Sequence, residues 1–243
     1  MFNIQTGMVC EGPTDFVVIQ SILKSLEAGS ATHRFFPVTQ LQPIASDAFG
    51  GFGPSGSGWG GVYRWCRESR IAGKGQLSRD PRIQHMDLII YHIDYDVSTF
   101  SYSDDRIEQE VGDKNLPYIS PCPPSFNSIE YLRDVLLSWM GESITPPKTV
   151  FCIPAYNTET WVAALLYPDA LFLQKDDREC NDAGLHCLLQ KGLIKKKSGQ
   201  YKKTRRKYEL YSTQMSFQWK EVTGIFPGAQ RFDKEMHSFL AMH

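Results

Sequence analysis

Hydrophobic residues along the first two thirds of the chain occur in blocks whose spacing predicts strands followed by helices. Residues 1–10 form a short apolar block typical of a strand. Residues 13–29 carry apolar side chains at helical spacing, with a proline at the start and a glycine at the end, and predict an amphipathic helix. Residues 86–97 contain a continuous apolar run, which is typical of a strand buried on both faces.

The same alternation continues to about residue 168. Pro37 lies inside an apolar segment at 33–41, so this strand is expected at a sheet edge or with a break. The remaining segments are a glycine-rich loop at 49–61, helices at 59–73, 125–142 and 157–168, and a strand at 148–156. Strands that alternate with helices of this length predict an α/β fold with a largely parallel sheet flanked by helices.

The pattern changes in the last third of the chain. Beyond about residue 168 the strand-like blocks end, and the remainder is expected to be basic and mainly helical, closing with an amphipathic helix at 226–242. We therefore expect an α/β domain at 1–168 and a C-terminal extension at 169–243, which forms a separate lobe or packs on the same sheet. Within the extension, residues 195–203 (KKKSGQYKK) are expected to be flexible.

Composition places the chain among soluble globular proteins, with 42% hydrophobic and 22% charged residues. The chain contains no run of 18 apolar residues, the length that a membrane-spanning helix needs, so no membrane partner is expected. The first residues lack a basic segment followed by an apolar core, which predicts a cytoplasmic rather than a secreted protein. The six cysteines show neither a CxxC pair nor zinc-site spacing, and they are expected to be reduced.

The net charge of -1 conceals a strongly basic segment. Residues 191–207 contain nine basic and no acidic residues, which leaves 17 basic against 27 acidic residues elsewhere. Such a segment can bind a phosphate backbone through counterion release, and either Lys202 or Lys203 could stabilise charge on a reacting phosphate. The alternative is a solvated loop that keeps the protein soluble. The candidate nucleic-acid-binding residues are Lys195, Lys196, Lys197, Lys202, Lys203, Arg205, Arg206 and Lys207.

Acidic side chains follow two of the predicted strands. Glu11 follows the first strand, and Asp94 and Asp96 end the apolar run at 86–97. Ligands gather at the carboxyl ends of parallel strands, and an extended chain would place Asp94 and Asp96 on one face. Adjacent carboxylates repel each other, and a hard cation such as Mg²⁺ or Mn²⁺ relieves this repulsion. Asp15, in the first helical turn, can point to the same place or simply favour the helix N-terminus electrostatically.

Two of these segments together resemble a known family. VCEGPTDF (residues 9–16) and LIIYHIDYDV (residues 88–97) resemble the Toprim domain, whose signatures are a glutamate after the first strand and an Asp-x-Asp after a later one. The form with an acid four residues after the glutamate looks most like OLD-type nucleases and small stand-alone bacterial Toprim proteins linked to phage defence. The resemblance covers roughly residues 6–167.

The resemblance implies roles for individual residues. Glu11 matches the glutamate that serves as metal ligand or general acid/base, and Asp94 and Asp96 match the metal-binding aspartates. Asp15 matches the additional ligand of the OLD-type site. Glu159 matches a glutamate that precedes a tryptophan after the last strand of the stand-alone proteins.

These residues favour a metal-dependent nuclease that cleaves DNA or RNA with one or two Mg²⁺ or Mn²⁺ ions. The number of ions stays open, because the chain has Ser98 where some Toprim proteins have a third acid. The resemblance alone implies antiviral defence, with a partner defence protein and a homo-oligomer as open alternatives. The second hypothesis is a non-enzymatic Toprim-like module that binds nucleic acid or protein, and the third is priming or topoisomerase chemistry.

Overall fold

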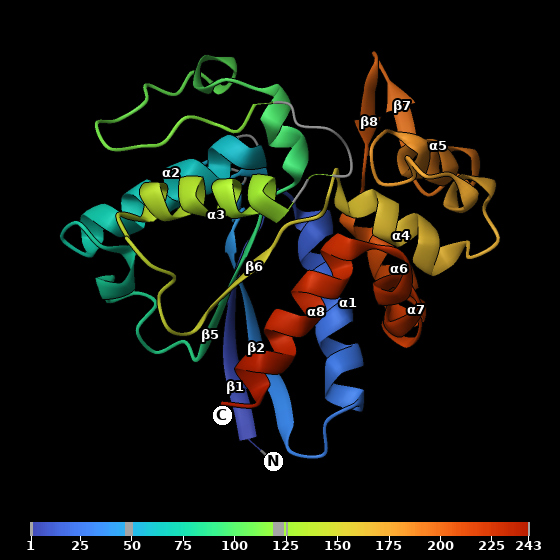
Figure 1. Ribbon diagram of the computed structural model, residues 1–243, viewed down its shortest axis with the longest axis horizontal. Coiled ribbons are helices and arrows are strands. Elements are labelled where there is room, and N and C mark those ends of the chain that lie inside the picture. Colours follow the sequence, from blue (N-terminus) through green and yellow to red (C-terminus); the bar gives the residue numbers. More distant parts are fainter. Residues whose placement is uncertain (1, 47–50, 119–123, 125, 243) are drawn as a thin grey trace.

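The computed structural model describes residues 2–46, 51–118, 124 and 126–242 of the chain. Four parallel strands form its central sheet, in the order β2-β1-β5-β6 (Figure 1). They are β1 (Phe2–Val9), β2 (His33–Gln42), β5 (Leu88–His92) and β6 (Thr149–Cys152). The prediction of an α/β fold with a parallel sheet is confirmed.

Helices cover both faces of this sheet (Figure 1). One face packs against α2 (Gly58–Ala72) and α3 (Phe126–Met140), and the other packs against α1 (Pro13–Ala28) and α8 (Pro227–Leu240). No helix in the described part of the chain is long and apolar enough to cross a membrane. The remaining elements are α4 (Thr158–Leu166), α5 (Ala183–Gln190), α6 (Arg205–Phe217), α7 (Trp219–Ile225), the short pair β3 (Ala45–Ser46) and β4 (Gly51–Phe52), and the 3-10 helices η2 (Leu77–Arg79), η3 (Tyr95–Thr99), η4 (Tyr102–Asp105) and η5 (Leu171–Gln174).

Strand β5 contributes to the cores on both faces of the sheet. Leu88 and Ile90 belong to the hydrophobic cluster that contains α1 and α8. Ile89 and Tyr91 belong to the cluster that contains α2 and α3. Because successive side chains of a strand point to opposite faces, both kinds of position must be apolar. The burial predicted from the continuous apolar run is thereby confirmed.

Strand β2 forms one edge of the sheet, as Pro37 predicted. Phe35 pairs with Ile4 and Val38 pairs with Thr6, so Pro37 lies where the register of the two strands shifts. A proline has no backbone N–H to donate to a neighbouring strand, and it is tolerated at such an irregular edge position.

The last third of the chain packs on the sheet. Tyr208, Trp219, Phe232 and Met236 are buried in the same cluster as Ile4 of β1. Helices from this segment therefore complete the core on the α1 face. The exact boundary near residue 168 stays a prediction, because contacts of this kind do not define where a domain ends.

The segment predicted to be flexible forms a hairpin, and its flexibility stays a prediction. Strands β7 (Lys195–Lys197) and β8 (Gln200–Lys202) pair in antiparallel fashion, with Lys197 opposite Gln200. Ser198 and Gly199 between them have φ angles of 51° and 79°. Tight two-residue hairpin turns require positive φ at both positions, and glycine supplies one of them without strain.

Among the described residues, the cysteines differ from the prediction at Cys180. Cys10, Cys66 and Cys152 are buried free thiols, and Cys187 is a partly buried one. Cys180 is disulfide-bonded, so the expectation of reduced cysteines throughout is wrong there. A disulfide depends on which thiols the fold brings together, and sequence spacing does not show this.

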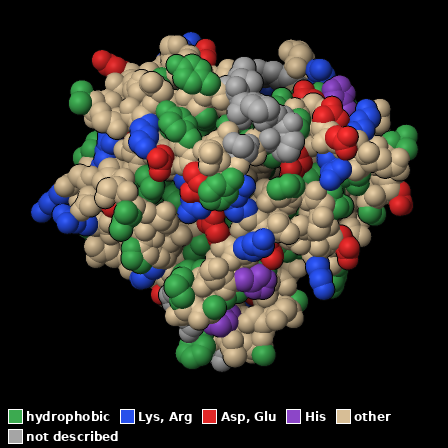
Figure 2. Space-filling model, viewed as in Figure 1, with side chains coloured by type: hydrophobic (Ala, Val, Ile, Leu, Met, Phe, Trp, Pro, Cys, Tyr) green, Lys and Arg blue, Asp and Glu red, His purple; other side chains and the backbone are tan. Residues whose placement is uncertain are grey.

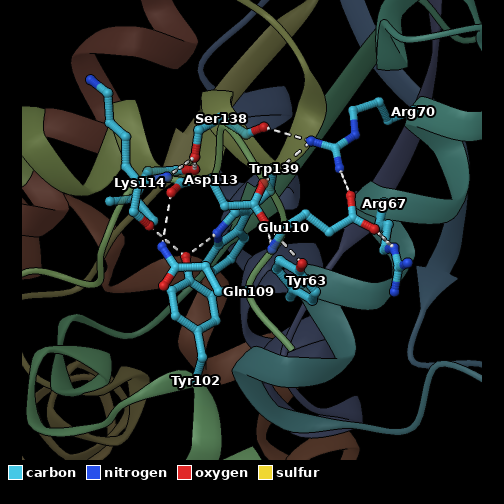
Figure 3. A network of polar contacts seen from close by, with 11 residues as sticks. Tyr63, Arg67, Arg70, Tyr102, Gln109, Glu110, Asp113, Lys114, Ser138 and Trp139 are labelled. Carbon is cyan, nitrogen blue, oxygen red and sulfur yellow. Dashed lines mark hydrogen bonds and ion pairs between the residues drawn. The ribbon is translucent and has the colours of Figure 1, made fainter. Parts of the chain in front are cut away.

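A polar network fixes the segment that follows η4 against α2 and α3 (Figure 3). Arg70 of α2 contacts the carboxylates of Glu110 and Asp113 and donates a hydrogen bond of 3.0 Å to the carbonyl of Ser138. The Tyr63 hydroxyl donates to the other oxygen of Asp113 at 2.7 Å. Residues that extend this network are Arg67, Tyr102, Gln109, Lys114 and Trp139.

Arg70 and Arg67 offer a matched test of this network. The Asp113 side chain is fully buried, so Arg70→Ala should lower the free energy of unfolding by about 3 kcal/mol, the usual cost of leaving a buried charge without its partner. Arg67 is 46% exposed, and Arg67→Ala should cost less than about 1 kcal/mol. Urea unfolding of both variants measures the difference, and equal losses would contradict the role assigned to Arg70.

Candidate metal centre

Three carboxylates meet at the carboxyl ends of two neighbouring strands. Glu11 follows β1, and Asp94 and Asp96 follow β5, which pairs with β1 through Val9 and Tyr91. One oxygen from each carboxylate lies within 4.8 Å of the others. The Oε1 atom of Glu11 also accepts a hydrogen bond of 2.8 Å from the backbone N–H of Asp94. The carboxylates that sequence spacing predicted to meet therefore do so.

The turn around Glu11 explains its position. Gly12 is the extended N-cap residue of α1, and Pro13 occupies the first helical turn. Proline suits this position because its missing N–H would have no helical partner there. The carbonyl of Glu11 accepts a hydrogen bond of 2.8 Å from the backbone N–H of Gly58, so the glycine-rich loop lies against this turn.

The two aspartates meet for a reason other than strand alternation. Strand β5 ends at His92, and Asp96 lies in the 3-10 helix η3, so the expectation of an extended Asp94–Asp96 segment is wrong. The backbone N–H of Asp96 donates to the carbonyl of Tyr156 at 3.3 Å. A turn, rather than a pleat, brings the second aspartate back to the first.

Asp94 is held by groups from α4 and β5. Its Oδ1 atom accepts hydrogen bonds of 3.1 Å from both the backbone N–H and the hydroxyl of Thr158, at the start of α4. The Nε2 atom of His92 lies 3.2 Å from the same oxygen. Helix N-termini favour negative charge, so α4 both orients and stabilises this carboxylate.

Two further acids predicted as ligands lie close to the cluster. Asp15 is 3% exposed, and its Oδ1 atom has no hydrogen-bond partner among the described residues. Glu159 is fully buried. Both contribute to the raised pKa of Asp96, after burial and the charge of Asp94. The cluster found among the described residues contains only the three carboxylates above, so a ligand role for Asp15 and Glu159 stays a prediction.

Glu159 is instead paired with two residues of the C-terminal segment. The Nζ atom of Lys203 lies 2.6 Å from its Oε2 atom, and the Tyr208 hydroxyl donates to its Oε1 atom at 3.0 Å. Burial alone would lower the pKa of Lys203, but Glu159, Asp15 and Asp94 raise it above its ordinary value. Lys203 therefore stays an ammonium group beside the carboxylates, whereas its neighbour Lys202 lies in β8, opposite Lys195.

The other basic residues of the segment have varied surroundings. Lys195, Lys196 and Lys197 are exposed on the hairpin. Arg205 pairs with Glu209 at 2.8 Å and donates to Gln40 at 2.9 Å, so part of its charge is used within the protein. The Nζ atom of Lys196 lies 5.0 Å from the centre of the Tyr201 ring, Lys207 donates to the Gly192 carbonyl, and Arg206 is exposed. On the face of the molecule that Figure 2 shows, the Lys and Arg side chains are interspersed with Asp and Glu side chains.

The electrostatics of the cluster favour a cation. Burial, followed by the charges of Asp94 and Asp96, raises the pKa of Glu11 well above its ordinary value. Burial and Asp94 likewise raise the pKa of Asp96 to about 8. Asp96 therefore retains its proton at neutral pH unless a positive ion replaces it. Oxygen ligands of this kind suit Mg²⁺ or Mn²⁺.

The raised pKa predicts how metal affinity depends on pH. An ion that binds Asp96 must displace its proton at any pH below about 8. The dissociation constant for Mn²⁺ should therefore fall about tenfold per pH unit as the pH rises towards that value, and then level off. Titration calorimetry in buffers of different ionisation enthalpy measures both affinity and proton release. An affinity that is flat across this range, without proton release, would contradict the assignment.

Sequence reasoning missed several residues of the site. Thr158 was not singled out from the sequence as a site residue; the structure places the helix cap at Asn157, whose Oδ1 atom accepts from the backbone N–H of Thr160 at 3.1 Å, and makes Thr158 the first residue of α4. Because Asn157 caps α4, the backbone N–H and the hydroxyl of Thr158 are free to bind Asp94. The asparagine before Thr158 was therefore the signal in the sequence that could have identified Thr158. Tyr208 and Tyr156 gave no such signal, because their contacts are long-range.

Comparison of the chain with protein-family models, curated proteins and solved structures found no match. The functional argument therefore depends on the geometry of the site and on the residues that form it.

Proposed function

We propose that this protein is a metal-dependent nuclease that hydrolyses phosphodiester bonds of DNA or RNA. The observation that carries the proposal is the meeting of Glu11, Asp94 and Asp96 within 4.8 Å at the carboxyl ends of β1 and β5. Like charges at close range are unfavourable, and three carboxylates at one place, one of them buried and two half-buried, are hard to explain by packing.

The residues of the cluster fit one or two Mg²⁺ or Mn²⁺ ions. All three offer carboxylate oxygens, and the unpartnered, buried Oδ1 atom of Asp15 is a further oxygen that needs a positive partner. Glu11, Asp94 and Asp96 would hold the first ion, and Asp15 with Glu159 would add ligands for a second. A bound ion of this kind activates water and stabilises the entering and leaving oxygens of a phosphodiester.

The chain's own residues perform the remaining tasks. Thr158 and His92 orient the Asp94 carboxylate, through contacts of 3.1 and 3.2 Å. Glu159 and Tyr208 position the ammonium group of Lys203, which would stabilise negative charge as it develops on the phosphate. Glu11, whose pKa is raised by burial and by the neighbouring aspartates, would serve as a general acid or base.

Nucleic acid is the proposed partner because the basic segment leads directly to the site. The exposed lysines of the β7–β8 hairpin lie a few residues from Lys203, so a strand whose phosphates contact the hairpin could continue to the carboxylates. The resemblance to Toprim proteins supports the same substrate class. A role in antiviral defence is proposed on that resemblance alone.

Cleavage assays test the proposal. Purified protein is incubated with plasmid DNA and with single-stranded RNA, in Mg²⁺, Mn²⁺ or EDTA, beside the Asp94→Ala/Asp96→Ala variant. We expect cutting of at least one substrate that EDTA and the double variant both abolish.

A matched control removes two exposed acids elsewhere. Glu108→Ala/Asp176→Ala changes the net charge equally, and both residues are exposed and distant in sequence from the cluster. This control should cut like wild type. Inertness of wild type on every substrate, with nucleic-acid binding retained, would contradict the nuclease and favour a binding module.

A further inference from the structure

A cavity of about 880 Å³ lies next to the metal centre, in a region that neither the carboxylates nor the hairpin lysines explain. Its walls come from Tyr156, the chain around η5 and one side of α5. Tyr156 connects the cavity to the metal centre. Its carbonyl accepts the hydrogen bond from the backbone N–H of Asp96, and the same residue lines the cavity.

The β7–β8 hairpin and the residue that follows it also connect the cavity to the metal centre. The Tyr201 hydroxyl lies 3.3 Å from Nε2 of His186, which lines the cavity, and the two rings meet edge to face. Two residues further along, Lys203 contacts Glu159. A ligand in the cavity would therefore lie beside a phosphate held near Lys203.

The residues that line the cavity indicate which kind of chemical group it can bind. Ala170, Phe172 and Ala183 provide apolar surface, while side chains that can donate or accept hydrogen bonds line the remainder. The latter include Asn181, Asp182, His186 and Gln190. Small-molecule sites typically combine apolar walls with a few such groups, in volumes of about 300–1,000 Å³.

Charge in the cavity disfavours a phosphate. Asp169 and Asp182 are both in its walls, and the carboxylate of Asp182 lies beside the Tyr156 phenol. Lys191 is the lysine among the described lining residues, and its Nζ atom lies 5.2 Å from the centre of the Tyr167 ring. Two carboxylates against one ammonium group disfavour an anion, and the mixture of apolar and hydrogen-bonding walls suits a neutral ligand such as a ring that carries donors and acceptors.

We propose that this cavity binds the base of a nucleotide adjacent to the scissile phosphate, an inference that rests on the proposed nuclease function. The sugar-phosphate backbone would run past Lys203 while the base enters between Tyr156 and α5. A base inside a duplex cannot reach such a cavity without unstacking, at a cost of a few kcal/mol. The substrate class is therefore single-stranded or locally unpaired nucleic acid.

Uncharged nucleosides test the cavity without requiring cleavage. Adenosine, guanosine, cytidine, thymidine and uridine are titrated into metal-free protein while the imidazole ¹H–¹⁵N resonances of His186 are followed by NMR. At least one nucleoside should shift these resonances in a saturable way. Absence of any saturable shift with all five would overturn the proposal, whatever the cleavage assays show.

Two variants and one control locate the binding. Ala183→Trp fills the cavity and should weaken nucleoside binding at least about tenfold, equivalent to about 1.4 kcal/mol. Asp182→Ala should weaken it several-fold without unfolding α5, because the Asp182 side chain makes no capping hydrogen bond. Ala72→Trp, at an exposed position at the end of α2, should bind like wild type. Unchanged affinity in both cavity variants would overturn the assignment.

Cleavage then separates this inference from the proposed function. With an active enzyme, an abasic site next to the scissile phosphate should lower kcat/KM at least about fivefold, the effect of losing roughly 1 kcal/mol of base contact. An active enzyme that is indifferent to the abasic site contradicts base binding alone. An inactive enzyme that still binds nucleosides contradicts the nuclease alone.

Discussion

Glu11→Gln is expected to lower the rate of metal-dependent cleavage by at least about 10³-fold, because metal ions supply several kcal/mol of transition-state stabilisation. The same substitution should raise the thermal stability of the metal-free protein. The amide oxygen of glutamine can still accept the hydrogen bond from the Asp94 N–H, but it adds no negative charge to the cluster.

The gain in stability should grow with pH. Burial, then Asp94 and Asp96, raise the pKa of Glu11 above its ordinary value of 4.5. Between that value and the raised pKa, the folded protein holds a proton that the unfolded chain has lost, so wild-type stability falls as the pH rises. Glutamine does not titrate, so the variant should gain most at high pH, by about 2–4 °C in Tm per kcal/mol of relief.

Thermal unfolding in EDTA at several pH values measures this gain, with Glu108→Gln as the control at an exposed acid. Added Mn²⁺ should raise the Tm of wild type and of the control more than that of Glu11→Gln. A Glu11→Gln variant that is less stable than wild type at high pH, yet cleaves normally, would contradict both the charge cluster and its role.

The second large effect is expected from Lys203→Ala. This substitution should lower kcat by about 10²–10³-fold while Mn²⁺ binding is retained. The ammonium group is the positive side chain in contact with Glu159, and its removal takes away the charge that faces a developing negative phosphate. Stability should also fall by about 1–3 kcal/mol, because the buried Glu159 then loses its charged partner and keeps the hydrogen bond from Tyr208.

A double variant separates these two consequences. Lys203→Ala/Glu159→Gln removes both charges of the pair, including the buried carboxylate, so it should recover much of the stability lost in Lys203→Ala without recovering kcat. Lys196→Ala, on the exposed hairpin, should leave kcat unchanged and weaken nucleic-acid binding modestly and in a salt-dependent way. Recovery of kcat in the double variant would show that Lys203 acts through stability alone.

The fold was predictable where the pattern was local. The apolar run of β5 and the proline and glycine at the ends of α1 mark these elements without knowledge of their neighbours. The hairpin at 195–202 was missed because its strands are lysine-rich and exposed, so no alternation of apolar and polar residues indicated them. Only the Ser198–Gly199 pair carried a turn signal.

The site was predictable in part for the same reason. Glu11, Asp94 and Asp96 each follow a recognisable strand, and adjacent parallel strands bring such positions together. The pairing of Glu159 with Lys203 spans 44 residues and depends on where the chain after β8 meets α4. No spacing in the sequence indicates it, nor does any spacing indicate the cavity beside Tyr156.

The most direct test of the metal centre is the number of Mn²⁺ ions bound, counted by electron paramagnetic resonance of free Mn²⁺ during titration. Wild type and the exposed-acid control Glu108→Asn/Asp176→Asn should each bind one or two ions per chain, and Asp94→Asn/Asp96→Asn should bind at least about a hundredfold more weakly. Equal stoichiometry and affinity in all three proteins would contradict the account, because the ion would then not depend on the carboxylates at the ends of β1 and β5.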